Sequence, residues 1–182
     1  MQRTIVTPAV LPQSALAELK QWLGITTAHD DALLAALLHT ALETCESFTG
    51  TLPLEASCEE TLPAMPGWQR LATRPVMAIT GIDGLTATGD RFALPAQAYA
   101  IELDADGSGR VNVMTPGAVT RVVVAFSAGL APAWDALPDT LRHGIVRLAA
   151  HQHREREASG AGPVPPASVA ALWRPWRRLR LA

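Results

Sequence analysis

The stretch HQHREREA at 151–158 contains two histidines and two glutamates that could bind a metal ion. In a helix, residues two apart point in nearly opposite directions, so His151 and His153 cannot hold one ion. The pairs that can meet are four residues apart, His151 with Glu155 and His153 with Glu157, and they lie on opposite faces. Each pair supplies two ligands, whereas a zinc site needs three or four. The favoured interpretation is a solvated helix end with Arg–Glu pairing, so no metal or other cofactor is expected.

A metal-dependent hydrolase is the alternative that this stretch leaves open, with His143, His151, Glu155 and Glu157 as the ligands. Arg147 counts against it, because this arginine lies between His143 and His151 on the helix and a cation there opposes metal binding.

A second candidate ion site is DADGSGR at 104–110, which begins like a calcium-binding loop. The EF-hand pattern needs a glutamate near position 115, where this chain has threonine. The flanking segments AYAIEL and RVNVM are typical of strands, and Asp, Gly and Ser suit a hairpin turn. A turn is therefore favoured over a calcium site.

Motifs for a nucleophile or a bound nucleotide are missing from the sequence. It contains no Gly-x-Ser-x-Gly, no Walker loop and no Gly-x-Gly-x-x-Gly. Cys45 lies on the apolar face of a predicted helix and is expected to be structural. Cys58 is expected in a loop beside two glutamates, which would raise the pKa of its thiol. No catalytic constellation is recognised, so the chain is not expected to be an enzyme.

Three helices are expected, at 14–23, 27–50 and 138–158. Ser14 could cap the first and Gly24 could end it. Thr27 followed by Asp30 resembles a capping box for the second, and Gly50 could end that helix. Each helix carries an apolar stripe at helical spacing. The stripes comprise Leu16, Leu19, Trp22 and Leu23; Leu33, Leu34, Leu37, Leu38, Ala41, Leu42, Cys45 and Phe48; and Leu141, Ile145, Leu148 and Ala149.

Between the second and third helices the pattern changes. Residues 51–67 contain several prolines and are expected to form a loop. From 68 to 127, short segments rich in β-branched residues alternate with Gly, Asp and Pro, which predicts four to six antiparallel strands. The fold class is therefore α+β: a small helical bundle core of three main helices plus a C-terminal segment, with an antiparallel β insertion at about 61–130.

The bulk composition is that of an ordinary globular chain of 182 residues, with 48% hydrophobic and 18% charged residues. No apolar run reaches the roughly 18 residues that a membrane span needs, so no membrane contact is expected. The N-terminus lacks the apolar core of a secretion signal, and Cys45 and Cys58 are the only cysteines. A reducing compartment without disulfides is therefore expected.

The C-terminal end combines tryptophan with arginine after a Pro/Gly-rich linker at 159–167. Tryptophan and arginine are enriched at binding hot spots, which favours a docking segment at 168–182 that a partner orders. Two alternatives stay open: the tryptophans fold back and close the core, or the segment binds single-stranded nucleic acid through phosphate contacts and stacking. The candidate docking residues are Trp173, Trp176, Arg174, Arg177, Arg178 and Arg180.

The order of these pieces resembles the phage head–tail connector (adaptor) family, which includes adaptors of gene transfer agents. The early LKQWLGI followed by DDALLAALLHTALETCESFTG resembles the opening of that family. The later VVVAFSAG followed by LPDTLRHGIVRLAAHQHREREA resembles its second signature, and VAALWRPWRRLRLA resembles its close. Here Trp173 takes the place of a leucine and Trp176 that of a tyrosine.

The resemblance implies a structural particle protein. It implies a ring, usually of twelve copies, between the portal and the stopper, head-completion or tail protein, through which DNA passes without sequence-specific binding. It implies a single adaptor domain over 1–158 and portal docking through 168–182, at the head–tail junction of a particle assembled in the bacterial cytoplasm. The copy number, the oligomeric state of the isolated chain, and the choice between phage and gene transfer agent stay open.

Overall fold

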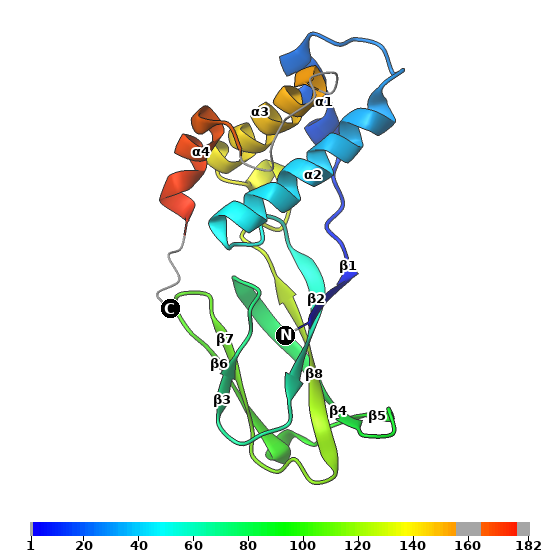
Figure 1. The fold of residues 1–182 in the computed structure, drawn as a ribbon, viewed down its shortest axis with the longest axis vertical. Coiled ribbons are helices and arrows are strands. Elements are labelled where there is room, and N and C mark those ends of the chain that lie inside the picture. Colours follow the sequence, from blue (N-terminus) through cyan, green and yellow to red (C-terminus); the bar gives the residue numbers. More distant parts are fainter. Residues whose placement is uncertain (1, 156–164, 178–182) are drawn as a thin grey trace. The chain divides into compact units, whose positions relative to one another are not determined.

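The computed structural model describes residues 2–155 and 165–177, which fold into two compact units (Figure 1). The sheet unit takes residues 1–9 and 55–130, and the helical unit takes residues 10–54 and 131–182. The chain therefore first adds one strand to the sheet unit and two helices to the helical unit. It then returns to the sheet unit for the remaining strands and to the helical unit for the remaining helices. The predicted α+β class is confirmed, because the described residues form four helices and antiparallel sheets of eight strands.

The helical unit is built around α3. Its α-helices are α1 (Gln13–Leu23), α2 (Asp31–Thr49), α3 (Asp139–Glu155) and α4 (Ala167–Trp173), with short 3-10 turns η2 (Trp134–Ala136) and η3 (Arg174–Trp176). Helix α3 packs against α1, α2 and α4. The stripe predicted for α3 is buried throughout, and the α2 stripe is buried at Leu34, Leu38, Ala41 and Cys45.

The starts of α1 and α2 differ from the sequence predictions, whereas their stops agree; the end predicted for the third helix, at 158, lies outside the described residues. Helix α1 has Pro12 at its N-cap, and the Ser14 hydroxyl reaches the Asp135 carboxylate at 3.4 Å instead of capping the helix. The capping box predicted from Thr27 is wrong, because α2 begins at Asp31 and Asp30 makes no side-chain cap. Gly24 and Gly50 end α1 and α2 in the left-handed conformation, at φ 72° and 71°, which favours glycine because no Cβ is present.

The sheet unit contains two antiparallel sheets. The first has the order β1-β2-β8-β4-β5 and the second the order β3-β7-β6. Their strands are β1 (Gln2–Thr7), β2 (Ala56–Pro63), β3 (Trp68–Arg70), β4 (Val76–Thr86), β5 (Arg91–Ala93), β6 (Tyr99–Leu103), β7 (Gly109–Val113) and β8 (Val119–Ala128), with a 3-10 turn η1 at Ala96–Ala98. No described helix is long and apolar enough to cross a membrane.

The loop predicted for 51–67 is wrong over Ala56–Pro63, because β2 lies there between β1 and β8. Alternate residues of β2 are buried, and one of them is the charged Glu60. Its carboxylate accepts hydrogen bonds from the backbone N–H groups of Ala72 and Thr73, both at 2.8 Å, and from the Thr73 hydroxyl at 2.6 Å. These three donors replace water for the buried charge, which is why a glutamate can lie inside this strand.

Candidate functional site

The C-terminal segment begins with α4, and its first tryptophan lies in the core of the helical unit. Val169 and Trp173 are four residues apart, so they share the buried face of the short helix. Trp173 is 0% exposed, and its indole N–H donates to the carbonyl oxygen of Leu141 at 3.3 Å. The ring packs on Gly144 of α3 and meets the Phe48 ring at 5.9 Å between centroids. Trp173 therefore holds α4 on the helical unit from the inside.

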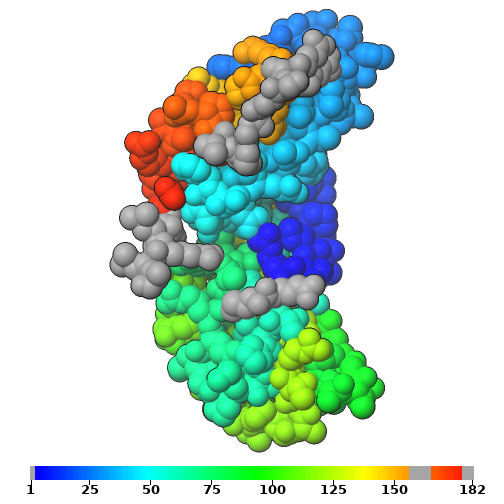
Figure 2. Space-filling view, in the orientation of Figure 1, coloured from blue at the N-terminus to red at the C-terminus, as the bar shows by residue number. Residues whose placement is uncertain are grey.

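The following residues lie at the surface of the same unit. The Trp176 indole N–H donates to the Thr140 hydroxyl at 3.0 Å, and its ring is half-buried. Arg174 and Arg177 are exposed, and the Arg177 guanidinium lies 5.5 Å from the centroid of Phe48 in a cation–π contact. Figure 2 shows the end of the described chain at this surface.

The structure therefore separates the six predicted docking residues. Arg174, Trp176 and Arg177 form a surface that a partner can reach, which we call the C-terminal surface. Trp173 lies beneath it, in the position that the core-closing alternative predicted for it. Arg178 and Arg180 lie outside the described residues. The portal-docking role of these residues stays a prediction.

The metal ligands considered from the sequence do not lie together in the structure. His151 pairs with Glu155 at 2.9 Å, as the four-residue spacing predicted. His143 instead meets the Trp22 ring edge-on, at 5.1 Å between centroids, and Glu157 lies outside the described residues. Within residues 2–155 and 165–177, no three His, Cys, Asp or Glu side chains are placed to hold a metal ion.

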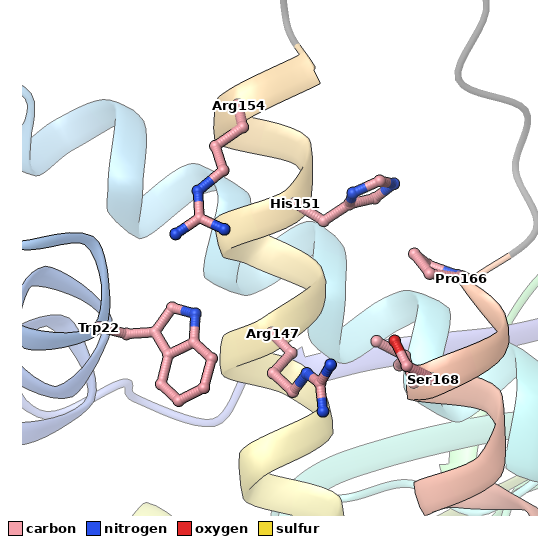
Figure 3. A pocket seen from close by; sticks show the side chains of 7 residues that line it. Trp22, Arg147, His151, Arg154, Pro166 and Ser168 are labelled. Atoms are coloured by element: carbon pink, nitrogen blue, oxygen red, sulfur yellow. The ribbon is translucent and has the colours of Figure 1, made fainter.

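A shallow basic pocket of about 150 Å³ lies on α3, where the sequence analysis considered His151 as a metal ligand and predicted no anion site. Figure 3 shows Arg147, His151 and Arg154 on one face of α3, with Trp22 of α1 on one side and Ser168 of α4 on the other. Neither arginine forms an ion pair with another described residue, so the pocket favours anionic groups such as carboxylates. The spacing of Arg147, His151 and Arg154 was the sequence signal that could have revealed this pocket, because residues at these positions share one face of a helix.

The other stretches with possible chemistry are structural. Residues 104–108 turn between β6 and β7, as predicted, and the Asp104 carboxylate pairs with Arg110 at 2.8 Å. Burial, with a smaller contribution from Glu46, raises the pKa of the Cys45 thiol to about 12, which leaves it protonated and unreactive. Cys58 is buried in β2, so its predicted loop position is wrong.

Neither a protein-family model nor a curated protein sequence matches the chain. Solved structures do match, and three of them contain chains of gene transfer agent (GTA) particles. The neck of an empty GTA particle, computed with C6 symmetry, contains a chain 26% identical, with a TM-score of 0.78. The neck of a native GTA particle, computed with C12 symmetry, contains one 28% identical, with a TM-score of 0.77. The virion of a native GTA particle contains one 27% identical, with a TM-score of 0.75.

Each match covers 100% of this chain and 98% of the other. The chain thus shares its whole α+β architecture, in both units, with structural components of phage-like particles. The resemblance that the sequence motifs carry, to the head–tail connector proteins of gene transfer agents, is confirmed.

Proposed function

We propose that this chain is a structural head–tail adaptor of a phage-like particle, and that it works in the neck as a ring. The observation that carries the proposal is the end-to-end match with neck chains of GTA particles, at 26–28% identity and TM-scores of 0.75–0.78. A match that includes the whole sheet unit and the whole helical unit supports a shared role more strongly than a shared helical bundle would.

The ring has twelve copies in this proposal, in keeping with the C12 and C6 symmetries used for the matching necks. One face binds the portal, the other binds a stopper, head-completion or tail protein, and DNA passes through the centre without sequence-specific contacts. The protein is a structural part of the head–tail junction, assembled in the bacterial cytoplasm. It has no catalytic role.

The portal contact is assigned to the C-terminal surface, Arg174, Trp176 and Arg177, together with Arg178 and Arg180. Trp173 acts in this assignment as the internal anchor that fixes the direction in which α4 presents the surface. Guanidinium groups suit an acidic partner groove, because they bind carboxylates through two parallel hydrogen bonds.

The test is co-purification with the portal protein encoded nearby, followed by negative-stain imaging. Deletion of residues 161–182 is unsuitable, because it removes the buried Val169 and Trp173 and so opens the helical unit. The better variants are a deletion of residues 178–182 and the double substitution Arg174→Ala with Arg177→Ala. Arg121→Ala is the matched control, since Arg121 is an exposed arginine of the sheet unit.

We expect the wild-type chain and the Arg121 control to co-purify with the portal as rings, and both C-terminal variants to lose binding. Portal binding should also weaken as the salt concentration rises, because salt screens the attraction between exposed charges, over a distance of about 10 Å at 0.1 M. Portal binding that survives in both C-terminal variants would remove the docking role from this surface. A wild-type chain without affinity for the portal at any salt concentration would refute the adaptor function.

A further inference from the structure

The four edge strands of the two sheets differ in how well they are protected against pairing with another chain. The edges are β1 and β5 in the five-stranded sheet, and β3 and β6 in the three-stranded sheet. Natural proteins protect such edges with short strands, bulges, prolines or charges. β3 and β5 have three residues each and include an arginine. β6 is longer, because its five residues, YAIEL, keep regular pairing with β7. It contains no proline, and its one charged residue is Glu102, 3.2 Å from the Arg110 guanidinium.

The outer edge of β6 has backbone groups ready for a further strand. The Met114 N–H donates to the carbonyl oxygen of Ala98, and the Asp104 N–H donates to that of Ser108. The hydrogen-bonded pairs on either side of β6 are therefore at even-numbered residues, so the even-numbered residues of β6 bond towards β7. Hydrogen-bonded pairs alternate in an antiparallel ladder. Tyr99, Ile101 and Leu103 therefore direct their N–H and C=O groups away from β7. These groups form no backbone hydrogen bond with any other described strand.

The side chains of this edge are apolar and uncovered. Ile101 and Leu103 are each 46% exposed, although they share their face of the sheet with Val111 and Val113, which are fully buried. An added strand would extend that buried face over both residues. Backbone pairing with pockets for alternate side chains is the way in which proteins recruit an extended segment to a sheet.

β1 is the edge whose length and charge suit β6. It has six residues, QRTIVT, with a register irregularity between Ile5 and Thr7, and Ile5 and Val6 are 40% and 57% exposed. β1 contains one arginine, Arg3, whereas β6 is the one acidic strand among the four described edges, through Glu102, whose carboxylate also pairs with Arg110 at 3.2 Å. Opposite charges on adjacent strands favour pairing. Within the sheet unit, Figure 1 shows β1 and β6 on opposite sides.

We propose that the outer edge of β6 in one copy of this chain pairs with β1 of a second copy. Each copy then uses two different patches on opposite sides of its sheet unit. Such a head-to-tail contact generates a closed ring when the rotation between copies allows it. The inference rests on the proposed function, because a ring brings copies side by side, and it identifies the strands that join them.

The test places a photo-crosslinking residue, p-benzoylphenylalanine, at Ile101 of the full chain, with and without portal protein. We expect a ladder of covalent oligomers on a denaturing gel, and peptide mapping that joins position 101 to residues 2–7 of another copy. The same residue at Met77, an exposed position of β4, is the control and is expected to give no crosslink to β1. Crosslinks from position 101 that avoid residues 2–7, or the absence of a ladder, would overturn the proposal.

Ile101→Pro tests the backbone pairing directly. Proline removes the outward N–H of residue 101 and leaves the bonds of residues 100 and 102 to β7, which is a change that edge strands tolerate. We expect the loss of rings with an unchanged circular dichroism spectrum. If proline disturbs the hairpin, the double variant Ile101→Lys with Leu103→Lys makes the same test through the side chains. Rings at the wild-type level in a folded variant would refute the pairing.

Portal binding, measured on the same samples, keeps this inference separate from the proposed function. A β1–β6 crosslink in a chain that does not bind the portal would support the pairing and count against the adaptor role. Portal-bound rings without that crosslink would support the adaptor role and count against the pairing.

Discussion

We predict that Gly144 of α3 cannot accept even one methyl group without displacing Trp173, the residue that anchors the C-terminal segment. A Cβ built there meets three indole atoms of Trp173: Nε1 at too short a distance for any real contact, and Cδ1 and Cε2 both at 2.9 Å. Ordinary carbon contacts lie at about 3.5–4.0 Å, so the ring would have to move by roughly 1 Å. The ring is enclosed by the core and cannot rotate out of the way as a flexible chain could.

The expected effect of Gly144→Ala is a net loss of stability. Crowding a packed core costs about 1–3 kcal/mol. Moving the ring also breaks its hydrogen bond to Leu141, which is worth about 1 kcal/mol. Alanine is about 1 kcal/mol more favourable than glycine in a helix, which offsets part of the loss. The free energy of unfolding should therefore fall by about 1–3 kcal/mol, or about 2–4 °C in Tm for each kcal/mol.

The assay is urea unfolding followed by helical circular dichroism, in the wild-type chain and in a Trp173→Leu background. With the indole removed, Gly144→Ala should become neutral or stabilising by up to about 1 kcal/mol, because only the helix preference of alanine remains. This reversal of sign is specific to a clash between the two residues. If Gly144→Ala stabilised the wild-type chain, Trp173 would not lie against Gly144 and the account of the C-terminal anchor would be wrong.

Three further predictions concern single residues. Glu60→Gln should lower the free energy of unfolding by about 1.5–3 kcal/mol in urea titrations, because an amide cannot accept all three of the hydrogen bonds that the carboxylate accepts. Cys45 should resist a thiol reagent at neutral pH in the native chain and react in denaturant, since burial raises its pKa to about 12; rapid native labelling would contradict its position. Gly50→Ala should lower the free energy of unfolding by about 1–2 kcal/mol, because the left-handed φ of 71° is strained for alanine. Gly81→Ala should be neutral, because an added Cβ there meets nothing within 4 Å. Thermal melts of the two variants make the comparison.

The helices could be predicted from the sequence because their signals are local. The apolar residues of α3 recur at a spacing of three or four positions. Gly24 and Gly50 end α1 and α2 because glycine readily adopts the left-handed conformation. The helix starts were less predictable. Ser14 and Thr27 are good capping residues by type, yet neither caps a helix here, and Ser14 contacts Asp135, a residue far along the chain.

β1 and β2 were missed because their pairing partners lie far away in sequence. β2 alternates buried and outward residues, but Glu60 interrupts the apolar alternation that marks a strand. Its burial depends on the donors of Ala72 and Thr73, which reach it only after the chain has turned back. A buried carboxylate held by such donors has no signature in the local sequence.

The sequence by itself determined the α+β class, the three long helices, the hairpin turn at 104–108 and the resemblance to head–tail connectors, because helix stripes, turn residues and motif order are properties of short segments. Tertiary structure alone decided which tryptophan is an anchor and which can face a partner. Trp173 and Trp176 are three residues apart with similar neighbours, but a glycine of α3 admits the first into the core, and the Thr140 hydroxyl holds the second at the surface. Contacts of this kind depend on how separate helices meet, which no local pattern records.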